Sequence, residues 1–326
     1  MNIAVTGANG HVGINLCEEL LHQGHRVKAL THMHDSGLKH LEVEQIKGDI
    51  LVKDSLQNLV SNAEIVIHLA AKISINGAGD SSIRQINVDG TRNILQASIE
   101  NKVKRFIHFS SIHAFEQHPL NEVLDESRPL VSDKAFAYDM SKAEGERLVM
   151  DAAHDGFDAF VICPTAIIGP ADYEPSLTGK AMIELYHRQI PALVPGGYNW
   201  VDVRDVVQGC IASIERGKRG EKYLLSGRWR SLSEITRLIT QITGVKTPSL
   251  VMPFWVARVG LPFITLFSKI SGVQPLYTGE SLHIIKNGSR NISNMKARKD
   301  LGFNPRDLED TLTDLFQWFK ENGIIN

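Results

Sequence analysis

The chain has 326 residues, of which 43% are hydrophobic and 22% charged, and its formal net charge is −2. This is the composition of a globular protein with one large core or two domains. The near-neutral charge argues against nucleic acid or an anionic membrane as the main partner. The three cysteines are far apart and form no Cys-x-x-Cys pair, and Met1 leads straight into an apolar run, so we expect a cytoplasmic protein without a signal peptide.

The first predicted elements are a strand over residues 3–5 and a helix over 14–21, joined by a turn that contains Gly7, Gly10 and Gly13. The glycines permit a tight turn, close approach of a pyrophosphate to the backbone, and close packing of the helix on the strand. The N-terminus of the helix supplies unpaired N–H groups for the phosphates. The pattern predicts a dinucleotide-binding β-turn-α unit.

Strands and helices alternate through the first half of the chain. Such alternation predicts an α/β fold, a doubly wound parallel sheet of the Rossmann type, whose ligands bind outside the carboxyl ends of the strands. The later strands are expected at residues 26–30, 45–50, 64–69, 105–109 and 159–163, with helices around 88–100 and 135–153.

The pattern changes after Pro164, where proline and glycine become frequent and helices then dominate from Leu232 to the amphipathic segment 308–320. We predict a smaller, mainly helical C-terminal lobe that binds the substrate. The expected division is a Rossmann domain over 1–165, completed by elements near 199–228, and a substrate-binding lobe over 166–198 and 229–326. Within those elements, short strands at 201–203 and 222–225 are expected to return to the main sheet.

The stretch Val251–Ile270 is apolar enough to suggest a membrane, but Arg258 interrupts it and Pro253 and Pro262 break it. Its longest uncharged run, 259–268, is too short to span a bilayer. We therefore expect apolar helices of the substrate lobe and no membrane span; a hydrophobic substrate or docking at a membrane surface is the open alternative.

Tyr138 and Lys142 stand four residues apart in a predicted helix, so their side chains share one face. A lysine beside a phenol stabilises the phenolate and lowers the tyrosine pKa, which makes the phenol a usable acid or base near neutrality. The strand before this helix ends in Ser110 and Ser111, where a hydroxyl can hydrogen-bond a carbonyl oxygen as it gains charge. A solvated surface pair is the alternative for an isolated Tyr-x-x-x-Lys.

With these residues the chain resembles the extended short-chain dehydrogenase/reductases, the NAD-dependent epimerase/dehydratase family, nearly from end to end. One departure is Cys163, which replaces the arginine usual before Pro164. The segments that carry the resemblance are TGANGHVG (6–13), Gly48-Asp49-Ile50, His68-Leu69-Ala70-Ala71, Ile86 to Thr91, Phe106 to Ile112, Pro164, and Asn199 to Val206.

The resemblance implies hydride transfer between nicotinamide and a carbonyl or alcohol carbon, with Tyr138 exchanging the proton. Its catalytic residues are then Ser111, Tyr138, Lys142 and Asn87, and its substrate contacts Ser111, His113 and Tyr138. The cofactor-binding residues that it implies are Gly7, Asn9, Gly10, His11, Val12, Gly13, Thr31, His32, Asp49, Ile50, Leu69, Ala70, Ala71, Asn87, Tyr138, Lys142, Pro164 and Ile167.

Residues that are typical of two branches of this family are absent from the sequence. Dehydratases carry Asp-Glu where this chain has Ile112-His113, and epimerases place an asparagine and an arginine where it has Ala166 and Tyr198. A sugar diphosphate held without arginine is electrostatically poor. The chain looks closer to dihydroflavonol-reductase-like and 3β-hydroxysteroid-dehydrogenase-like members. The segment 275–282 also resembles those members. A nucleotide-sugar epimerase with tightly held NAD and a non-catalytic dinucleotide sensor are the open alternatives.

Cofactor choice depends on the end of the second strand, where Thr31 and His32 replace the acidic residue that holds the ribose of NAD. Thr31 removes a carboxylate that would repel a 2′-phosphate, and His32 can donate to one. We therefore favour NADP(H) modestly over NAD(H). His32 and His34 lack a nearby third ligand, so no metal site is expected. The family resemblance also implies a homodimer.

Overall fold

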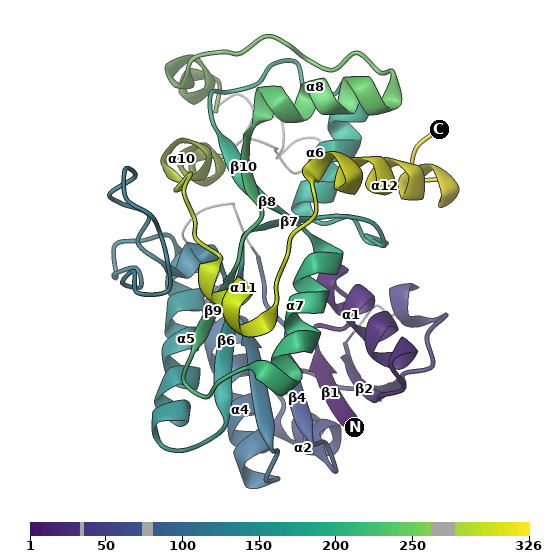
Figure 1. The fold of residues 1–326 in the computed structure, drawn as a ribbon, viewed down its shortest axis with the longest axis vertical. Coiled ribbons are helices and arrows are strands. Elements are labelled where there is room, and N and C mark those ends of the chain that lie inside the picture. Colours follow the sequence, from purple (N-terminus) through teal and green to yellow (C-terminus); the bar gives the residue numbers. More distant parts are fainter. Residues whose placement is uncertain (33–35, 74–80, 262–277) are drawn as a thin grey trace.

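The computed structural model describes residues 1–32, 36–73, 81–261 and 278–326 (Figure 1). His34, much of the apolar stretch 251–270 and part of the motif at 275–282 lie outside the described residues. Within the described ranges, no helix is long and apolar enough to cross a membrane.

A seven-stranded parallel sheet forms the centre of the lower half of the molecule in Figure 1. Its strand order, β3-β2-β1-β4-β5-β6-β9, reverses direction between β1 and β4, where doubly wound sheets bind their ligands. The predicted fold class is confirmed. The strands are β1 (Asn2–Thr6), β2 (Arg26–Thr31), β3 (Glu44–Lys47), β4 (Ile65–His68), β5 (Arg105–Phe109), β6 (Ala159–Pro164) and β9 (Lys222–Leu225).

Helices cover both faces of this sheet, and each face has its own apolar core. The helices α1, α7 and α11 pack on one face, and α2, α4 and α5 on the other. The central strands β4 and β6 are buried along their whole length, which explains their continuous apolar runs. These helices are α1 (His11–His22), α2 (Lys53–Val60), α4 (Gly90–Glu100), α5 (Ala137–His154), α7 (Val203–Arg216) and α11 (Met295–Leu301).

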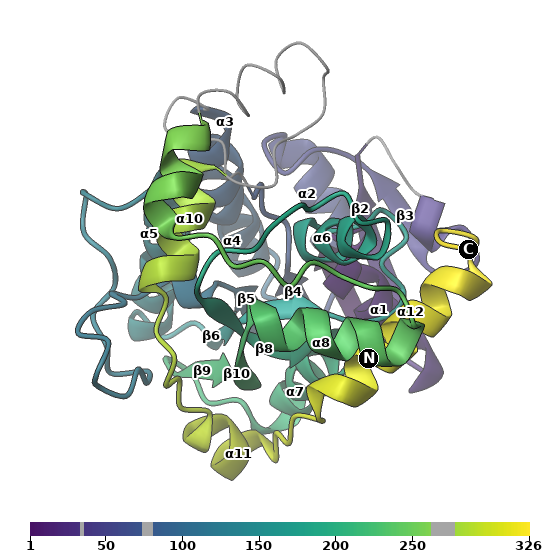
Figure 2. The same ribbon diagram turned by 90° about the horizontal axis from the view of Figure 1, so that it is seen from above.

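The remaining elements form a lobe above the carboxyl ends of the strands, as Figures 1 and 2 show. A second sheet, in the order β10-β8-β7, connects this lobe to the main domain. The elements are β7 (Ala166–Ile168), α6 (Leu177–Tyr186), β8 (Gly197–Asp202), β10 (Arg228–Ser231), α8 (Leu232–Thr243), α10 (Gly279–Asn287) and α12 (Leu308–Glu321). The shorter turns are η1 (Ser36–Leu38), α3 (Ser81–Arg84), the π-helical η2 (Gln85–Asp89) and η3 (Ile112–Ala114).

Two sequence predictions on strands were wrong in part. The strand expected to return to the main sheet at 201–203 belongs instead to β8, which pairs with β7 and β10, and α7 begins at Val203. The strand expected over 45–50 ends at Lys47. It stops there because the Asp49 carboxylate accepts a hydrogen bond from the Leu51 N–H at 2.8 Å, which forms a turn.

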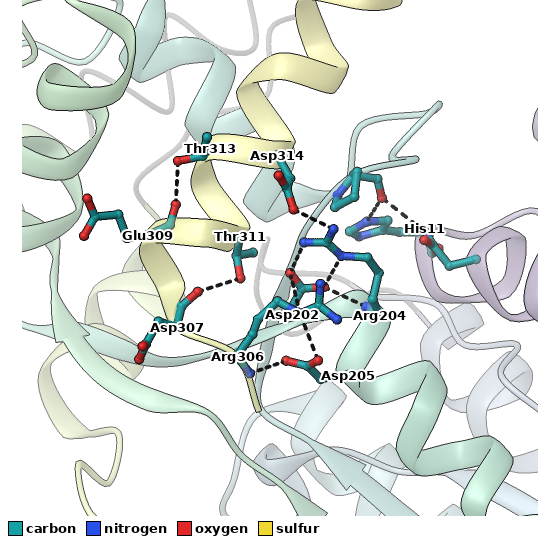
Figure 3. A network of polar contacts seen from close by, with 12 residues as sticks. His11, Asp202, Arg204, Asp205, Arg306, Asp307, Glu309, Thr311, Thr313 and Asp314 are labelled. Carbon is teal, nitrogen blue, oxygen red and sulfur yellow. Dashed lines mark hydrogen bonds and ion pairs between the residues drawn. The ribbon is translucent and has the colours of Figure 1, made fainter. Parts of the chain in front are cut away.

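A polar network joins the lobe to the main sheet (Figure 3). Asp202 caps α7, and its carboxylate is fully buried against the Arg204 guanidinium at 2.7 Å. Arg204 also reaches Asp314 of α12 at 2.6 Å, and Asp205 accepts from the backbone N–H of Arg306 at 2.8 Å. The acidic residues in the segment Asn199 to Val206 therefore anchor α12 on α7.

We predict that Arg204→Met lowers the free energy of unfolding by about 2 kcal/mol, because the buried Asp202 carboxylate loses its main donor. Urea unfolding measures the loss. Arg228→Met is the matched control, because the Arg228–Asp307 pair is two-thirds exposed on both sides, and it should change stability by less than about 0.5 kcal/mol. Equal losses in the two variants would contradict the structural role of the network.

Candidate active site

A glycine-lined turn joins β1 to α1. Gly7 has a φ of +71°, and a Cβ there would lie 2.6 Å from the backbone nitrogen of Ala70. A Cβ on Gly13 would lie 2.2 Å from the Gly7 carbonyl oxygen, so the helix packs directly on the turn. The position of Gly10 has more room, because a Cβ added there would contact the Gly7 carbonyl oxygen alone among the described residues, at 3.4 Å. No side chain caps α1, so its first N–H groups are available to a phosphate.

Three buried polar atoms near this turn have no hydrogen-bond partner in the part of the chain that the structure describes. They are Asn9 Oδ1, Thr31 Oγ1 and Ser110 Oγ, which follow or end strands β1, β2 and β5. A buried polar atom without a partner costs free energy, so such atoms indicate that a ligand supplies the missing bonds. Together with the open approach over Gly10, these atoms fit a bound dinucleotide.

The end of β4 is held by buried hydroxyls. The His68 ring contacts Thr6 Oγ1 at 2.6 Å and Thr91 Oγ1 at 2.9 Å, and Thr6 Oγ1 also accepts from the Ala70 N–H at 3.2 Å. Burial lowers the pKa of His68 to about 3, so the ring is neutral. This network fixes the backbone of Leu69, Ala70 and Ala71 against the glycine turn.

Asn87 connects two parts of the site. It lies in the π-helical turn η2, where it is buried. Its amide oxygen accepts from the Lys72 N–H at 2.7 Å, and its amide nitrogen donates to Lys72 O at 3.0 Å and to Ser141 Oγ at 2.9 Å. Asn87 therefore ties the loop after β4 to the helix that carries Tyr138 and Lys142.

Tyr138 and Ser111 meet above the carboxyl end of β5. Ser111 follows that strand, Tyr138 lies in the first turn of α5, and their hydroxyls share a hydrogen bond. Burial raises the pKa of Tyr138 to about 12, against the opposing effect of that hydrogen bond. The structure therefore brings together two of the predicted catalytic side chains, with a neutral phenol.

Lys142 does not act on Tyr138 as the sequence suggested. Its buried ammonium donates to the Phe109 carbonyl at 2.6 Å, and burial of the phenol sets the direction in which the Tyr138 pKa is shifted. Burial lowers the pKa of Lys142 to about 8. The expectation of a lowered Tyr138 pKa is therefore wrong for the protein without a bound cofactor. The Lys142 ammonium is held by a backbone carbonyl, and burial of the phenol raises the Tyr138 pKa.

Several of the residues expected to bind the cofactor have protein partners. His11 lies in the first turn of α1, and its Nε2 pairs with the carbonyl of Pro170 at 3.0 Å. His32 is exposed at the end of β2, and its Nε2 lies 3.4 Å from an Asp49 carboxylate oxygen. Ile50 is buried and packs under Gly90, where a Cβ would meet it at 2.9 Å. Asp49 and His32 thus act as one polar pair beside the second strand.

The other predicted residues lie around the same edge of the sheet. Val12 is partly buried in α1, Pro164 ends β6, and Ile167 lies in β7 immediately beyond it. His113, in η3, touches the Tyr138 ring edge-on with centroids 6.1 Å apart. Among the described residues no cluster of His, Cys, Asp or Glu could hold a metal ion.

The sequence reasoning missed Asp139. Its side chain is 13% exposed, and its Oδ1 lies 3.5 Å from His113 Nδ1. Acidic residues are common in the first turn of a helix, where they interact favourably with the helix dipole, so no local pattern singles Asp139 out. Its immediate position after Tyr138 was the one available signal.

A glycine turn at a free helix N-terminus, together with a half-buried phenol, a buried lysine and a buried serine near the carboxyl end of β5, fits an enzyme that uses a nicotinamide cofactor. The family comparison agrees. The chain belongs to the NAD dependent epimerase/dehydratase family, whose profile matches residues 3–226. It is an NAD(P)-dependent reductase/dehydrogenase of the extended short-chain type.

Individual relatives are similar along the whole chain. The "Sterol demethylase protein B" of Methylococcus capsulatus is 30% identical over 331 residues and covers 100% of both chains. The "Putative dihydroflavonol 4-reductase" of Synechocystis is 31% identical and aligns with 98% of this chain and 95% of its own length. The crystal structure of gox2253 superimposes with a TM-score of 0.85 at 30% identity, over 100% of this chain and 99% of that one.

Proposed function

We propose that the protein transfers a hydride between NADP(H) and the carbonyl or alcohol of a small, fairly apolar, ring-containing substrate. The observation that carries this proposal is the half-buried phenol of Tyr138, hydrogen-bonded to Ser111 at the carboxyl end of β5. A protonated phenol next to a second hydroxyl is suited to give a proton to a carbonyl oxygen.

The chain's own residues would divide the work as follows. When bound, the cofactor supplies or accepts the hydride at its nicotinamide ring. Tyr138 donates its proton to the substrate oxygen in reduction and takes it back in oxidation, while Ser111 hydrogen-bonds the same oxygen as it gains charge. The Lys142 ammonium would contact the bound cofactor, as the family resemblance implies, and Asn87 holds α5 in place through Ser141.

The substrate class rests on what surrounds the site. At the positions where epimerases carry polar groups for a sugar diphosphate, this chain has Ala166 and Tyr198, and Tyr198 packs edge-on against Trp200 at 5.2 Å. A diphosphate bound there would find no guanidinium at either of these two positions. Two full-length relatives carry the words sterol and dihydroflavonol in their names, which are apolar ring systems. Both facts support an apolar substrate.

The test is a panel of ring-containing ketones and aldehydes incubated with NADPH, with the absorbance of the reduced nicotinamide followed over time. Oxidation of NADPH by at least one carbonyl is expected. A parallel panel of UDP-sugars tests the alternative: isomerised sugar without net cofactor consumption, from protein that carries bound NAD, would replace the proposal with an epimerase. Cofactor binding with no turnover on either panel would favour the non-catalytic sensor.

The preference for NADP(H) rests on Thr31 and His32, because neither brings a carboxylate to the 2′-phosphate and the imidazole can donate to it. We predict that His32→Ala raises the KM for NADPH about fivefold and leaves the KM for NADH unchanged. The preference for NADP(H) should be modest, because the Asp49 carboxylate lies 3.4 Å from His32 Nε2 and competes with a 2′-phosphate for the imidazole. Steady-state kinetics with both cofactors measure it, with His154→Ala at the far end of α5 as the control. Equal changes for both cofactors would exclude this role of His32.

The cytoplasmic location stays part of the proposal. Cys17, Cys163 and Cys210 are free and buried. Burial raises the pKa of each thiol, which keeps it protonated and inert. Such cysteines suit a reducing compartment.

A further inference from the structure

Asp139 is a carboxylate enclosed next to the reacting phenol. It directly follows Tyr138 in the first turn of α5 and is 13% exposed. Its Oδ1 has no hydrogen-bond partner among the described residues, although His113 Nδ1 lies 3.5 Å away. A buried carboxylate oxygen without a hydrogen bond lowers the stability of the fold. Its presence beside Tyr138 therefore suggests a role in function.

The groups that face Asp139 come from three elements. His113 of η3 is half-buried, and its desolvation lowers its pKa to about 4, so it is a neutral neighbour near pH 7. Glu280 of α10 is a second buried carboxylate. Lys142, on the same helix as Asp139, is held by the Phe109 carbonyl, and the exposed His283 of α10 lies against the Phe136 ring.

These neighbours leave the negative charge of Asp139 poorly compensated. Burial, followed by the charge of Glu280, raises the pKa of Asp139 to about 7. Asp139 is therefore neutral in mild acid and anionic in mild base. When it is anionic, its charge raises the pKa of Tyr138 further, because a phenolate beside a carboxylate is repelled.

We propose that Asp139 is a positioning residue that acts on Tyr138 by charge: its carboxylate keeps the phenol protonated and so holds the site in the form that carbonyl reduction consumes. This inference rests on the proposed function, and it goes beyond it by assigning the pH at which the site changes. Reduction needs the phenol as proton donor, and oxidation needs the phenolate as acceptor. An anionic Asp139 favours the first form above about pH 7.

The sign of the effect can be followed through the pH range. Below the pKa of Asp139 the wild type and Asp139→Asn carry the same charge at this position, and their phenols should behave alike. Above it the wild type gains a charge that the asparagine lacks. The phenol of Asp139→Asn should therefore ionise about one pH unit lower than that of the wild type.

A spectroscopic titration tests this without turnover. The ultraviolet absorbance of ionised tyrosine is recorded against pH for the wild type, for Asp139→Asn, and for each of them with Tyr138→Phe, so that the differences isolate Tyr138. The midpoint for Tyr138 should fall by about one pH unit in Asp139→Asn. Asp151→Asn is the matched control, since Asp151 is exposed on the same helix, and its midpoint should equal that of the wild type.

Alcohol oxidation gives the second readout. The rate of Asp139→Asn relative to the wild type should be near one below about pH 6 and rise to about tenfold above pH 8, since one pH unit is tenfold in the ionised fraction. Glu280→Gln keeps Asp139 but removes the neighbouring charge that raises the Asp139 pKa. In that variant Asp139 should ionise, and begin to suppress alcohol oxidation, at a lower pH than in the wild type. A purely structural role of Asp139 would change the rate by the same factor at every pH.

The outcomes separate the two proposals. An unchanged midpoint for Tyr138 in folded Asp139→Asn would overturn the role of Asp139, whatever the enzyme reduces. A lowered midpoint in a protein that reduces no carbonyl would support the electrostatic coupling and reject the proposed function. A lowered midpoint together with a rate ratio that is flat across pH would also overturn the inference, because the coupling would then not reach the reaction.

Discussion

Tyr138→Phe should lower kcat for carbonyl reduction by about a thousandfold while the affinity for NADPH stays within about twofold of the wild type. The hydroxyl is the proton donor, and the phenyl ring that remains still fills the buried space beside Ser111. Stopped-flow and steady-state assays with the substrate from the ketone panel measure kcat, and fluorescence quenching measures cofactor binding.

Tyr186→Phe is the matched control for that variant. The Tyr186 hydroxyl donates to the carbonyl of Asn326 at 2.5 Å, far from the glycine turn in sequence and on the C-terminal lobe. Its loss should leave kcat unchanged. If Tyr138→Phe kept more than about a tenth of the wild-type kcat, another group would have to supply the proton, and the assignment of Tyr138 would be wrong.

The glycine turn should show two separable effects. Gly13→Ala is expected to destabilise the protein by about 3 kcal/mol or more, because its Cβ would lie 2.2 Å from the Gly7 carbonyl oxygen, a backbone atom that cannot move aside. The methyl group of Gly10→Ala would contact, in the described part of the chain, the Gly7 carbonyl oxygen alone, at 3.4 Å, so this variant should fold normally. Its methyl group would instead occupy the approach of the pyrophosphate and weaken dinucleotide binding by at least about tenfold.

Gly24→Ala controls for the loss of a glycine by itself. Gly24 has a φ of +77° and open space around the position of a Cβ, so alanine should cost about 1 kcal/mol of stability through backbone strain and leave cofactor binding unchanged. Thermal unfolding and dinucleotide titration of all three variants give the comparison. Gly13→Ala as stable as Gly24→Ala, or Gly10→Ala with full cofactor affinity, would refute the model of the turn.

The first half of the fold was predictable because its local signals agree with its packing. The runs at β5 and β9 predicted those strands at their observed limits, since buried parallel strands are rich in apolar and aromatic residues. The glycine turn was equally clear, because close backbone approach excludes a larger residue at Gly7 and Gly13. β8 was misplaced because its partners β7 and β10 are short and their pairing is decided by the lobe.

The site was predictable in its residues but not in its electrostatics. Spacing alone puts Tyr138 and Lys142 on one face of a helix. Whether the ammonium points at the phenol depends on the Phe109 carbonyl, which comes from a strand far away in sequence. Asp139 shows the same limit, because its raised pKa comes from burial and from Glu280 of α10. Side-chain charges in a closed site are set by tertiary contacts that local patterns do not carry.

Transfer of deuterium from NADPH that carries deuterium at both C4 positions to a ring-containing ketone tests the central claim most directly. We predict one deuterium in each molecule of alcohol formed, bound to the carbon that had been the carbonyl carbon, and almost no alcohol from the Tyr138→Phe protein in the same time. Cofactor that binds and keeps its deuterium in the presence of every carbonyl tested would contradict the account.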